Sequence, residues 1–146
     1  MYQIVDQIDF SYIAGAIDCD GTIGIYKKNT GYLSCRVSIA SVHLHFLQKL
    51  QKFFNGTIVS KKTCKPGHRL GYDLQWNKKD DVLNLLKNIE PFLLIKKKQA
   101  QIVISFLENY TQLYGGNGVD ESIKEKERER REELRSEIRI LNKQGV

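Results

Sequence analysis

Two aspartates, Asp18 and Asp20, follow a run of small and apolar residues near the start of the chain. Residues 12–21 read Tyr-Ile-Ala-Gly-Ala-Ile-Asp-Cys-Asp-Gly, which predicts a helix that ends in acids and is stopped by Gly21. Small residues allow two helices to approach closely, and an acid at the tip of such a pair would lie beside its twin. Because converging carboxylates favour a hard divalent cation, the segment predicts a metal site on paired helices.

Alternating polar and apolar residues predict two hairpins after this segment. Residues 32–40 place Leu, Cys, Val and Ile on one face and Ser, Arg and Ser on the other, and residues 69–77 also alternate. We expect strands over 22–28, 32–40, 57–63 and 69–77, and helices over 11–19, 43–54, 80–89, 96–114 and 120–142. Two such hairpins can form one four-stranded antiparallel sheet with helices on its apolar face. The predicted class is therefore α+β, in one domain over residues 1–146, with an open polar face rich in Arg and Lys.

Positive charge is concentrated in the body of the chain. The net charge is +6, yet residues 120–146 carry eight basic and eight acidic side chains and contribute none of it. A basic body predicts a polyanionic partner such as nucleic acid. In the charged C-terminal segment, Leu134, Ile138 and Leu141 predict a narrow stripe that packs on the body or on a partner.

The composition is that of an ordinary globular protein, with 41% hydrophobic and 27% charged residues. No apolar run approaches the roughly 18 to 20 residues that span a bilayer, and the N-terminus lacks the basic region and apolar core of a signal peptide. Cys19, Cys35 and Cys64 form no C-x-x-C pair, which argues for a reducing compartment and against a zinc site. We therefore expect an intracellular protein, in the cytoplasm or in an organelle.

Residues 13–21 resemble the LAGLIDADG motif of homing endonucleases. Six of the nine positions match, and Ile13, Ala16 and Cys19 differ. The expected order of elements is similar to the αββαββα fold of that family over roughly residues 10–142. Two further blocks look like family segments, namely residues 53–58 (Phe-Phe-Asn-Gly-Thr-Ile) and residues 91–100 (Pro-Phe-Leu-Leu-Ile-Lys-Lys-Lys-Gln-Ala).

The resemblance implies an active site around the end of the motif. Asp20 matches the acid that binds the metal at the scissile phosphates, whereas Asp18 is expected to act as a cap or hydrogen-bond acceptor. Lys98 matches the active-site lysine, which polarises water or stabilises the charged intermediate; the alternative is a solvated basic cluster that touches phosphates. Ser41 stands where many members carry a water-binding Gln, and its shorter side chain would need a bridging water.

The implied cofactor is Mg²⁺, with Mn²⁺ or Ca²⁺ possible in its place. The backbone of Cys19 from a partner copy and Gly21 could add to the carboxylate of Asp20 as metal ligands. Members with one motif act as homodimers, and nothing resembling residues 12–21 recurs in this chain. The implied dimer contact consists of Ile13, Ala14, Gly15, Ile17 and Asp18.

The open face of the sheet is the expected DNA-reading surface, because Arg suits guanine, Gln and Asn suit adenine, and Asp accepts from cytosine. The candidates are Tyr26, Lys28, Asn29, Ser34, Arg36, Ser38, Lys61, Arg69, Asp73 and Gln75. Phosphate contacts are expected from Lys27, Lys62, Lys65 and Lys97.

These expectations favour one function and leave two alternatives. The favoured function is a homodimeric, Mg²⁺-dependent homing endonuclease, free-standing and intron-encoded, that hydrolyses both strands of a long, pseudo-palindromic DNA target. The first alternative is a non-catalytic nucleic-acid binding protein of the same fold, either an RNA maturase or a DNA-binding regulator. The second is a basic dimeric protein with another kind of partner. No membrane or small-molecule cofactor is expected.

Overall fold

Helices and two hairpins alternate along the chain in the expected order. The computed structural model describes residues 2–61, 66–67, 69–108 and 120–143, and only the backbone of residues 2–9. The elements are α1 (Tyr2–Asp20), β1 (Gly21–Lys27), β2 (Leu33–Ser41), α2 (Leu44–Gln51), β3 (Thr57–Lys61), β4 (Gly71–Trp76), α3 (Lys79–Ile89), the 3₁₀ helix η1 (Glu90–Phe92), α4 (Lys97–Glu108) and α5 (Glu121–Lys143). The α+β class is confirmed.

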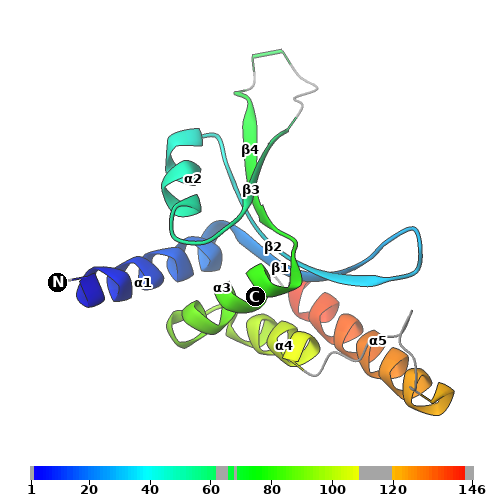
Figure 1. Ribbon diagram of the computed structural model, residues 1–146. Coiled ribbons are helices and arrows are strands. Elements are labelled where there is room, and N and C mark those ends of the chain that lie inside the picture. Colours follow the sequence, from blue (N-terminus) through cyan, green and yellow to red (C-terminus); the bar gives the residue numbers. More distant parts are fainter. Residues whose placement is uncertain (1, 62–65, 68, 109–119, 144–146) are drawn as a thin grey trace.

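The four strands form one antiparallel sheet in the order β1-β2-β4-β3. The β1–β2 and β3–β4 hairpins are joined through β2 and β4, where Ser38 lies opposite Gln75. The two hairpins diverge, so their tips point in different directions (Figure 1). In β3, Ile58 pairs with the buried Leu74, which places Lys61 on the opposite, open face of the sheet.

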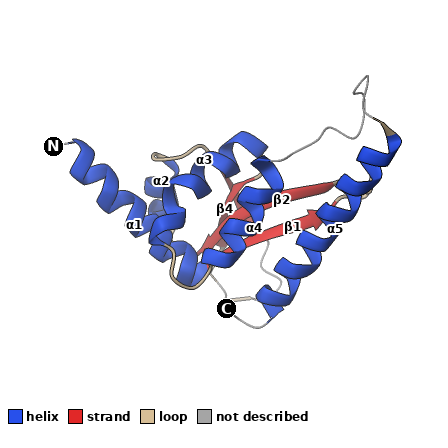
Figure 2. Ribbon diagram, turned by 90° about the horizontal axis from the view of Figure 1, so that it is seen from below, coloured by secondary structure: helices blue, strands red, loops and turns tan. Residues whose placement is uncertain are grey.

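The helices α1 to α5 each contribute side chains to a core on the other face of the sheet. Ile17 of α1, Leu47 of α2, Leu85 of α3, Val103 of α4 and Ile138 of α5 have no accessible surface. Figure 2 shows helices layered against the strands. Among the described helices, none is both long and apolar enough to cross a membrane.

Several helix boundaries differ from the sequence prediction. α1 extends back to Tyr2, and α2 ends at Gln51 because the Phe53 N–H bonds the carbonyl of Leu50 at 3.2 Å in a tighter final turn. α4 begins at Lys97 and is described as far as Glu108, so the rest of the expected helix lies outside the described residues.

Two glycines allow the backbone geometry that the sequence pattern requires. A Cβ at Gly21, where α1 passes into β1, would lie 2.7 Å from the Cα of Ile17. Gly31, in the turn between β1 and β2, has a φ of 88°. Both the abrupt end of α1 and the predicted turn at residues 29–31 therefore depend on the absence of a side chain.

α5 lies along β1, which is one of the two edge strands of the sheet. The Asn142 side-chain amide donates to the carbonyl of Ile23 at 3.1 Å, and Ile138 is buried in the core. Leu134 and Leu141 pack beside Ile138. The predicted apolar stripe is therefore confirmed, and it packs on the body of its own chain.

A buried ion network joins α5 to α4. Glu127 accepts hydrogen bonds from Arg130 and from Arg131, whose guanidinium also lies 5.7 Å from the ring centre of Phe106. Arg130 donates in addition to the carbonyl of Ser105. Burial by itself would raise the pKa of Glu127, but the hydrogen bonds from the two arginines outweigh burial and lower the pKa below its ordinary value.

We predict that Glu127→Gln lowers the free energy of unfolding by about 3 kcal/mol at neutral pH, because the buried Arg131 loses its counter-charge. A lowered pKa means that this stabilisation is present above the ordinary value of 4.5 and is lost as pH falls through the folded-state pKa. Urea unfolding of both proteins from pH 7 to pH 3 measures the difference, which should narrow in acid.

The matched control is Glu125→Gln, two residues away on the same helix. Glu125 and Arg128 form an exposed pair, so its loss should cost less than about 1 kcal/mol. Equal losses for the two variants would contradict the role given to the buried network.

Candidate active site and nucleic-acid interface

The carboxylate of Asp18 joins the end of α1 to the start of α4. It accepts the backbone N–H groups of Leu94 at 2.9 Å, Ile95 at 3.1 Å and Lys96 at 2.9 Å. The Lys96 ammonium also donates to the carbonyl of Asp18 at 2.7 Å. These N–H groups lie just before the first turn of α4, where the helix cannot satisfy them internally. The expectation that Asp18 is a cap is thereby confirmed.

Asp20, two residues further on, has the opposite environment. It is the last residue of α1, its side chain is exposed, and no described residue bonds its carboxylate. A negative charge is unfavourable at a helix C-terminus, since the carbonyl ends of the peptide dipoles gather there. A cation at this position would relieve that repulsion.

Only Lys98, of the three consecutive lysines, is without a partner among the described residues. Lys96 is bonded to Asp18, and Lys97 lies 3.9 Å from Glu90. Lys98 is exposed on the first turn of α4 and lines a pocket of about 490 Å³ together with Leu94 and Gln101. Because Asp18 holds residues 94–96, the segments bearing Asp20 and Lys98 meet at one end of the molecule.

Ser41 ends β2 at the same end of the sheet as the junction of α1 and β1. Gly21 pairs with Ile39, so the residue before Gly21 and the residues after Ile39 lie on the same side of this pair. The Ser41 hydroxyl accepts the N–H of His43 at 3.0 Å, at the start of α2. His43 and His45 are exposed. The tertiary structure therefore brings the segments of Asp20, Lys98 and Ser41 together.

The carboxylate at the end of α1 suits a divalent cation. Among the described residues of one chain, no three His, Cys, Asp or Glu side chains gather as metal ligands. The exposed, unbonded carboxylate of Asp20 nevertheless fits Mg²⁺, which takes one or two carboxylates and keeps water as its other ligands. A single chain thus contributes one carboxylate to such a site.

A chain of polar contacts crosses the open face of the sheet. Arg36 lies 5.4 Å from the ring centre of Tyr26 and donates to Asn77 at 2.6 Å. Asn77 in turn donates to Gln75 at 3.4 Å, and Lys61 pairs with Asp73 at 3.1 Å. The side chains that could recognise bases are therefore held by one another before any ligand binds.

The other candidate DNA contacts lie around this network. Ser34 and Ser38 share the open face, because they pair with Tyr26 and Thr22 of β1. Lys28, Asn29 and Arg69 are exposed and lie outside the strands. Lys27 pairs with Glu132 of α5 at 3.0 Å. Lys62 and Lys65 lie outside the described residues.

Four of the five residues expected at a dimer contact are instead buried within the chain. Ile13, Ala14 and Ile17 have no accessible surface, so their side chains cannot contact a second copy. Asp18 is 8% exposed and its carboxylate is used inside the chain. Gly15 is exposed, with no atom within 4 Å of the position that a Cβ would take. The alternation of buried and exposed positions on α1 explains the correction, since the helix packs one face on its own sheet.

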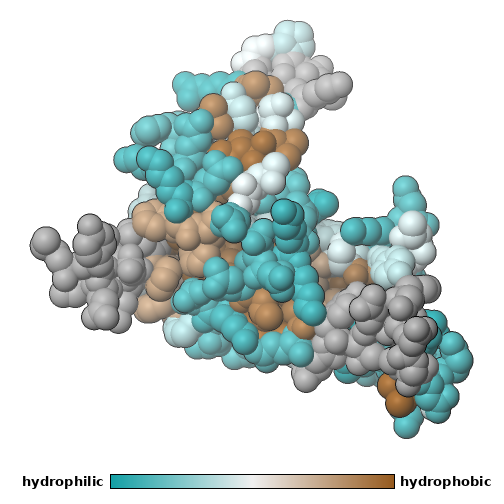
Figure 3. Space-filling model, viewed as in Figure 1, coloured by the Kyte–Doolittle hydropathy of each residue, from teal (hydrophilic) through white to brown (hydrophobic). Residues whose placement is uncertain are grey.

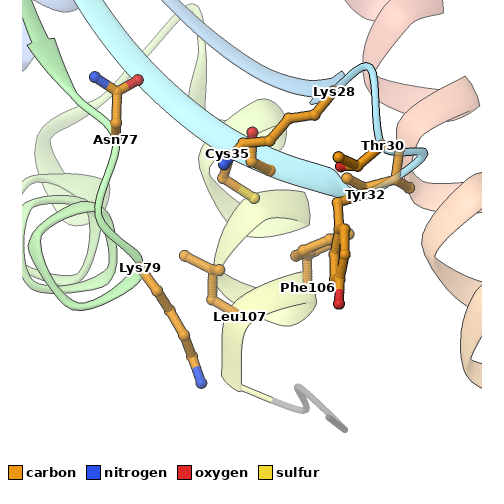
Figure 4. A pocket seen from close by; sticks show the side chains of 10 residues that line it. Lys28, Thr30, Tyr32, Cys35, Asn77, Lys79, Phe106 and Leu107 are labelled. Atoms are coloured by element: carbon orange, nitrogen blue, oxygen red, sulfur yellow. The ribbon is translucent and has the colours of Figure 1, made fainter. Parts of the chain in front are cut away.

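A further hollow lies apart from Asp20, Ser41 and Lys98, between the β1–β2 hairpin and α4 (Figure 4). It measures about 540 Å³, and the Cys35 side chain points toward α4, near Phe106 and Leu107. Burial raises the pKa of the Cys35 thiol to about 12, with a smaller opposing effect of Arg131. The thiol is therefore protonated at neutral pH. A protonated thiol is a poor nucleophile, so Cys35 acts here as a buried packing residue.

The sequence matches the LAGLIDADG-like domain over residues 7–90, which is more than half of the chain. The chain belongs to the LAGLIDADG family. A comparison with curated sequences gave no significant match.

Solved structures of LAGLIDADG homing endonucleases share the fold. I-CvuI, in complex with a DNA target and Mg, is 18% identical with a TM-score of 0.69, over 93% of this chain and 83% of I-CvuI. The archaeal intron-encoded I-Vdi141I, complexed with DNA, is 19% identical with a TM-score of 0.62, over 87% of this chain and 82% of its own. I-SmaMI, bound to an uncleaved DNA target with calcium ions, is 20% identical with a TM-score of 0.61, over 89% of this chain and 44% of its own.

Sequence reasoning missed two features of this LAGLIDADG protein. Asn77, the partner of Arg36, follows Gln75 by two residues, so the alternation that selected Gln75 could have included it. Leu94 is 89% exposed although it lies beside buried Leu93. No pattern in the sequence marks that exposure, because it arises when Asp18 holds the backbone of the segment.

We predict that Asp18→Asn lowers the free energy of unfolding by about 2 to 4 kcal/mol, because an amide cannot accept all three N–H groups that the carboxylate accepts. Asp20→Asn is the matched control and should change stability by less than about 0.5 kcal/mol, since Asp20 is exposed and unbonded. Chemical denaturation of both variants measures the difference. Similar stability of the two variants would contradict the capping role.

Proposed function

We propose that the protein is a metal-dependent, site-specific DNA endonuclease that acts as a homodimer on a long, pseudo-palindromic target. The observation that carries this proposal is the exposed, unbonded carboxylate of Asp20 at the tip of α1, on a segment that Asp18 joins to the start of α4, near Lys98. An open polar sheet face in the same chain provides a surface for the DNA.

The single carboxylate supports the homodimer. Two scissile bonds and a hard cation call for more than one acidic ligand, and a second copy would supply the twin of Asp20. The exposed side of α1 includes Tyr12, which is 60% exposed, together with Gly15 and Cys19. Figure 3 shows hydrophobic residues gathered where α1 passes α2. The chain matches 44% of I-SmaMI, so two copies would be needed to form a body of similar size.

The chemistry follows from the groups at this end of the molecule. A bound divalent cation would activate water and stabilise charge on the phosphate during hydrolysis of the P–O bond. Asp20 would hold that cation. The ammonium of Lys98 would stabilise negative charge on the phosphate oxygens or orient the attacking water, and the Ser41 hydroxyl would act through a bridging water.

Target recognition would use the open face of each sheet. Arg36, Asn77 and Gln75 carry the donors and acceptors that read base edges in a major groove. Since two copies related by a two-fold axis read two half-sites, the target would be long and nearly palindromic. An intron origin is part of the same proposal.

We predict that Asp20→Asn abolishes cleavage while DNA binding remains. Loss of the ligand that holds the cation should cost several kcal/mol of transition-state stabilisation, which is about a 10³-fold lower rate or more. The assay incubates the protein with DNA carrying the intronless allele of its host gene, with Mg²⁺ and then with EDTA, and follows double-strand cleavage on a gel.

Lys98→Gln should lower the cleavage rate with less effect on binding, while Lys126→Gln, a charge change on an exposed residue of α5, is the control. Cleavage by Asp20→Asn at the native rate would exclude the proposed site. Binding without cleavage under every divalent metal would favour a DNA-binding or RNA-maturing role instead.

We predict that Gly15→Leu converts the dimer to a monomer without unfolding the chain. No described residue outside the backbone of α1 lies within 4 Å of a Cβ at Gly15, so the new side chain is accommodated by the monomer but blocks the close approach of a second α1. Sedimentation equilibrium measures the molecular mass, and thermal unfolding measures the fold.

Gly15→Ala is the matched control for size. Its single methyl group should weaken the dimer far less, and alanine stabilises a helix by about 1 kcal/mol relative to glycine. A dimer that persists unchanged in Gly15→Leu would show that the copies meet elsewhere.

A further inference from the structure

We propose that α5 carries a binding site for the phosphodiester backbone of duplex DNA, formed by a cationic strip of Arg135, Arg139 and Lys143. This inference rests on the proposed DNA-binding function and assigns a second contact surface to it. Residues 135, 139 and 143 are spaced at four-residue intervals, so they share one face of the helix.

A pocket of about 320 Å³ lies between this strip and the edge strand β1. Arg135 and Arg139 line it from α5, while Tyr26 and Lys27 line it from β1. Figure 2 shows α5 passing alongside β1. Arg139 also lines a second hollow with Ser136 and Lys143, so its side chain borders both hollows.

The arginines of the strip have unused donors. The Nε of Arg135 is buried and has no hydrogen-bond partner among the described residues. Arg139 is exposed and likewise has no partner in the described part of the chain. The exposed guanidinium of Arg139 can donate to an incoming ligand, and phosphate oxygens suit the planar fork of arginine.

The charge of the pocket favours an anion. Lys27 and Arg135, which line it, are paired with Glu132 at 3.0 Å and 3.5 Å. The hydrogen bond from Lys27 lowers the pKa of Glu132 despite the opposing effect of burial, so the acid stays ionised. Glu132 is therefore shared between two cations, and Arg139 has no counter-charge among the described residues.

The position of the pocket connects it to the reading surface. Tyr26 lines the pocket and also lies on the open face, where Arg36 stacks on its ring. A duplex seated on the open face would bring a backbone strand past β1 toward α5. Contacts to phosphate fix the position of a protein on the duplex without reading sequence, which is the role we assign to the strip.

The test measures the salt dependence of binding to two labelled duplexes of unrelated sequence, each roughly three helical turns long, in EDTA so that no cleavage occurs. Each lost phosphate contact reduces the slope of log K against log salt by about 0.9. We expect Arg139→Gln to reduce the slope by this amount per copy and to weaken binding roughly tenfold on both duplexes. Arg139→Lys should keep most of the slope, because a point charge remains.

Lys126→Gln is the control, because it removes a cation from the same helix at an exposed position outside the pocket. If the native protein has a steep slope and Arg139→Gln has the same slope, the strip does not bind phosphate. The proposed function would be unaffected by that result. A loss confined to one duplex would show base reading and would also overturn the role of the strip. If the native protein bound neither duplex, both proposals would fall together. Thermal unfolding of each variant verifies that the fold is retained.

Discussion

The contact between Asp18 and residues 94–96 is the constraint on which the candidate active site depends. Asp20 and Lys98 are far apart in the sequence, and each lies two residues from this contact. Three N–H groups converge on one buried carboxylate, which is a strong arrangement because each bond to a charged acceptor is stronger than a neutral one. At the same contact the ammonium of Lys96 is bonded to Asp18, whereas Lys98 has no partner among the described residues. One acid of the motif thus builds the site, and the other acid remains free to act in it.

Hydrogen bonds between side chains also set the geometry of the open face of the sheet. Arg36, Asn77 and Gln75 bond one another in the free protein, so their geometry is set before DNA arrives. Base recognition would exchange these bonds for bonds to base edges, and the net gain per contact would be smaller than the gross strength of a hydrogen bond. Sequence preference would then come from the penalty of leaving one of these donors or acceptors without a partner.

Much of the architecture follows from local patterns. Period-two alternation in β2 and β4 assigned Val37 and Leu74 to the core and Arg36 and Gln75 to the open face, because successive side chains on a strand point to opposite faces. The LAGLIDADG-like motif indicated the family, the order of elements and the different roles of the two acids. These features depend on residues close together in the chain, and a sequence displays them directly.

The sequence by itself determined that a helix ending in Asp20 leads into a sheet with one polar face, since small residues, Gly21 and strict alternation require it. Only the tertiary structure decided which side of α1 is free. Ile13, Ala14 and Ile17 resemble contact residues in the sequence, but the sheet of the same chain already buries them, and Gly15 is left outside. The pairing of Asp18 with residues 94–96 and the docking of α5 on β1 likewise join distant segments. Such contacts depend on three-dimensional packing, which local spacing does not specify.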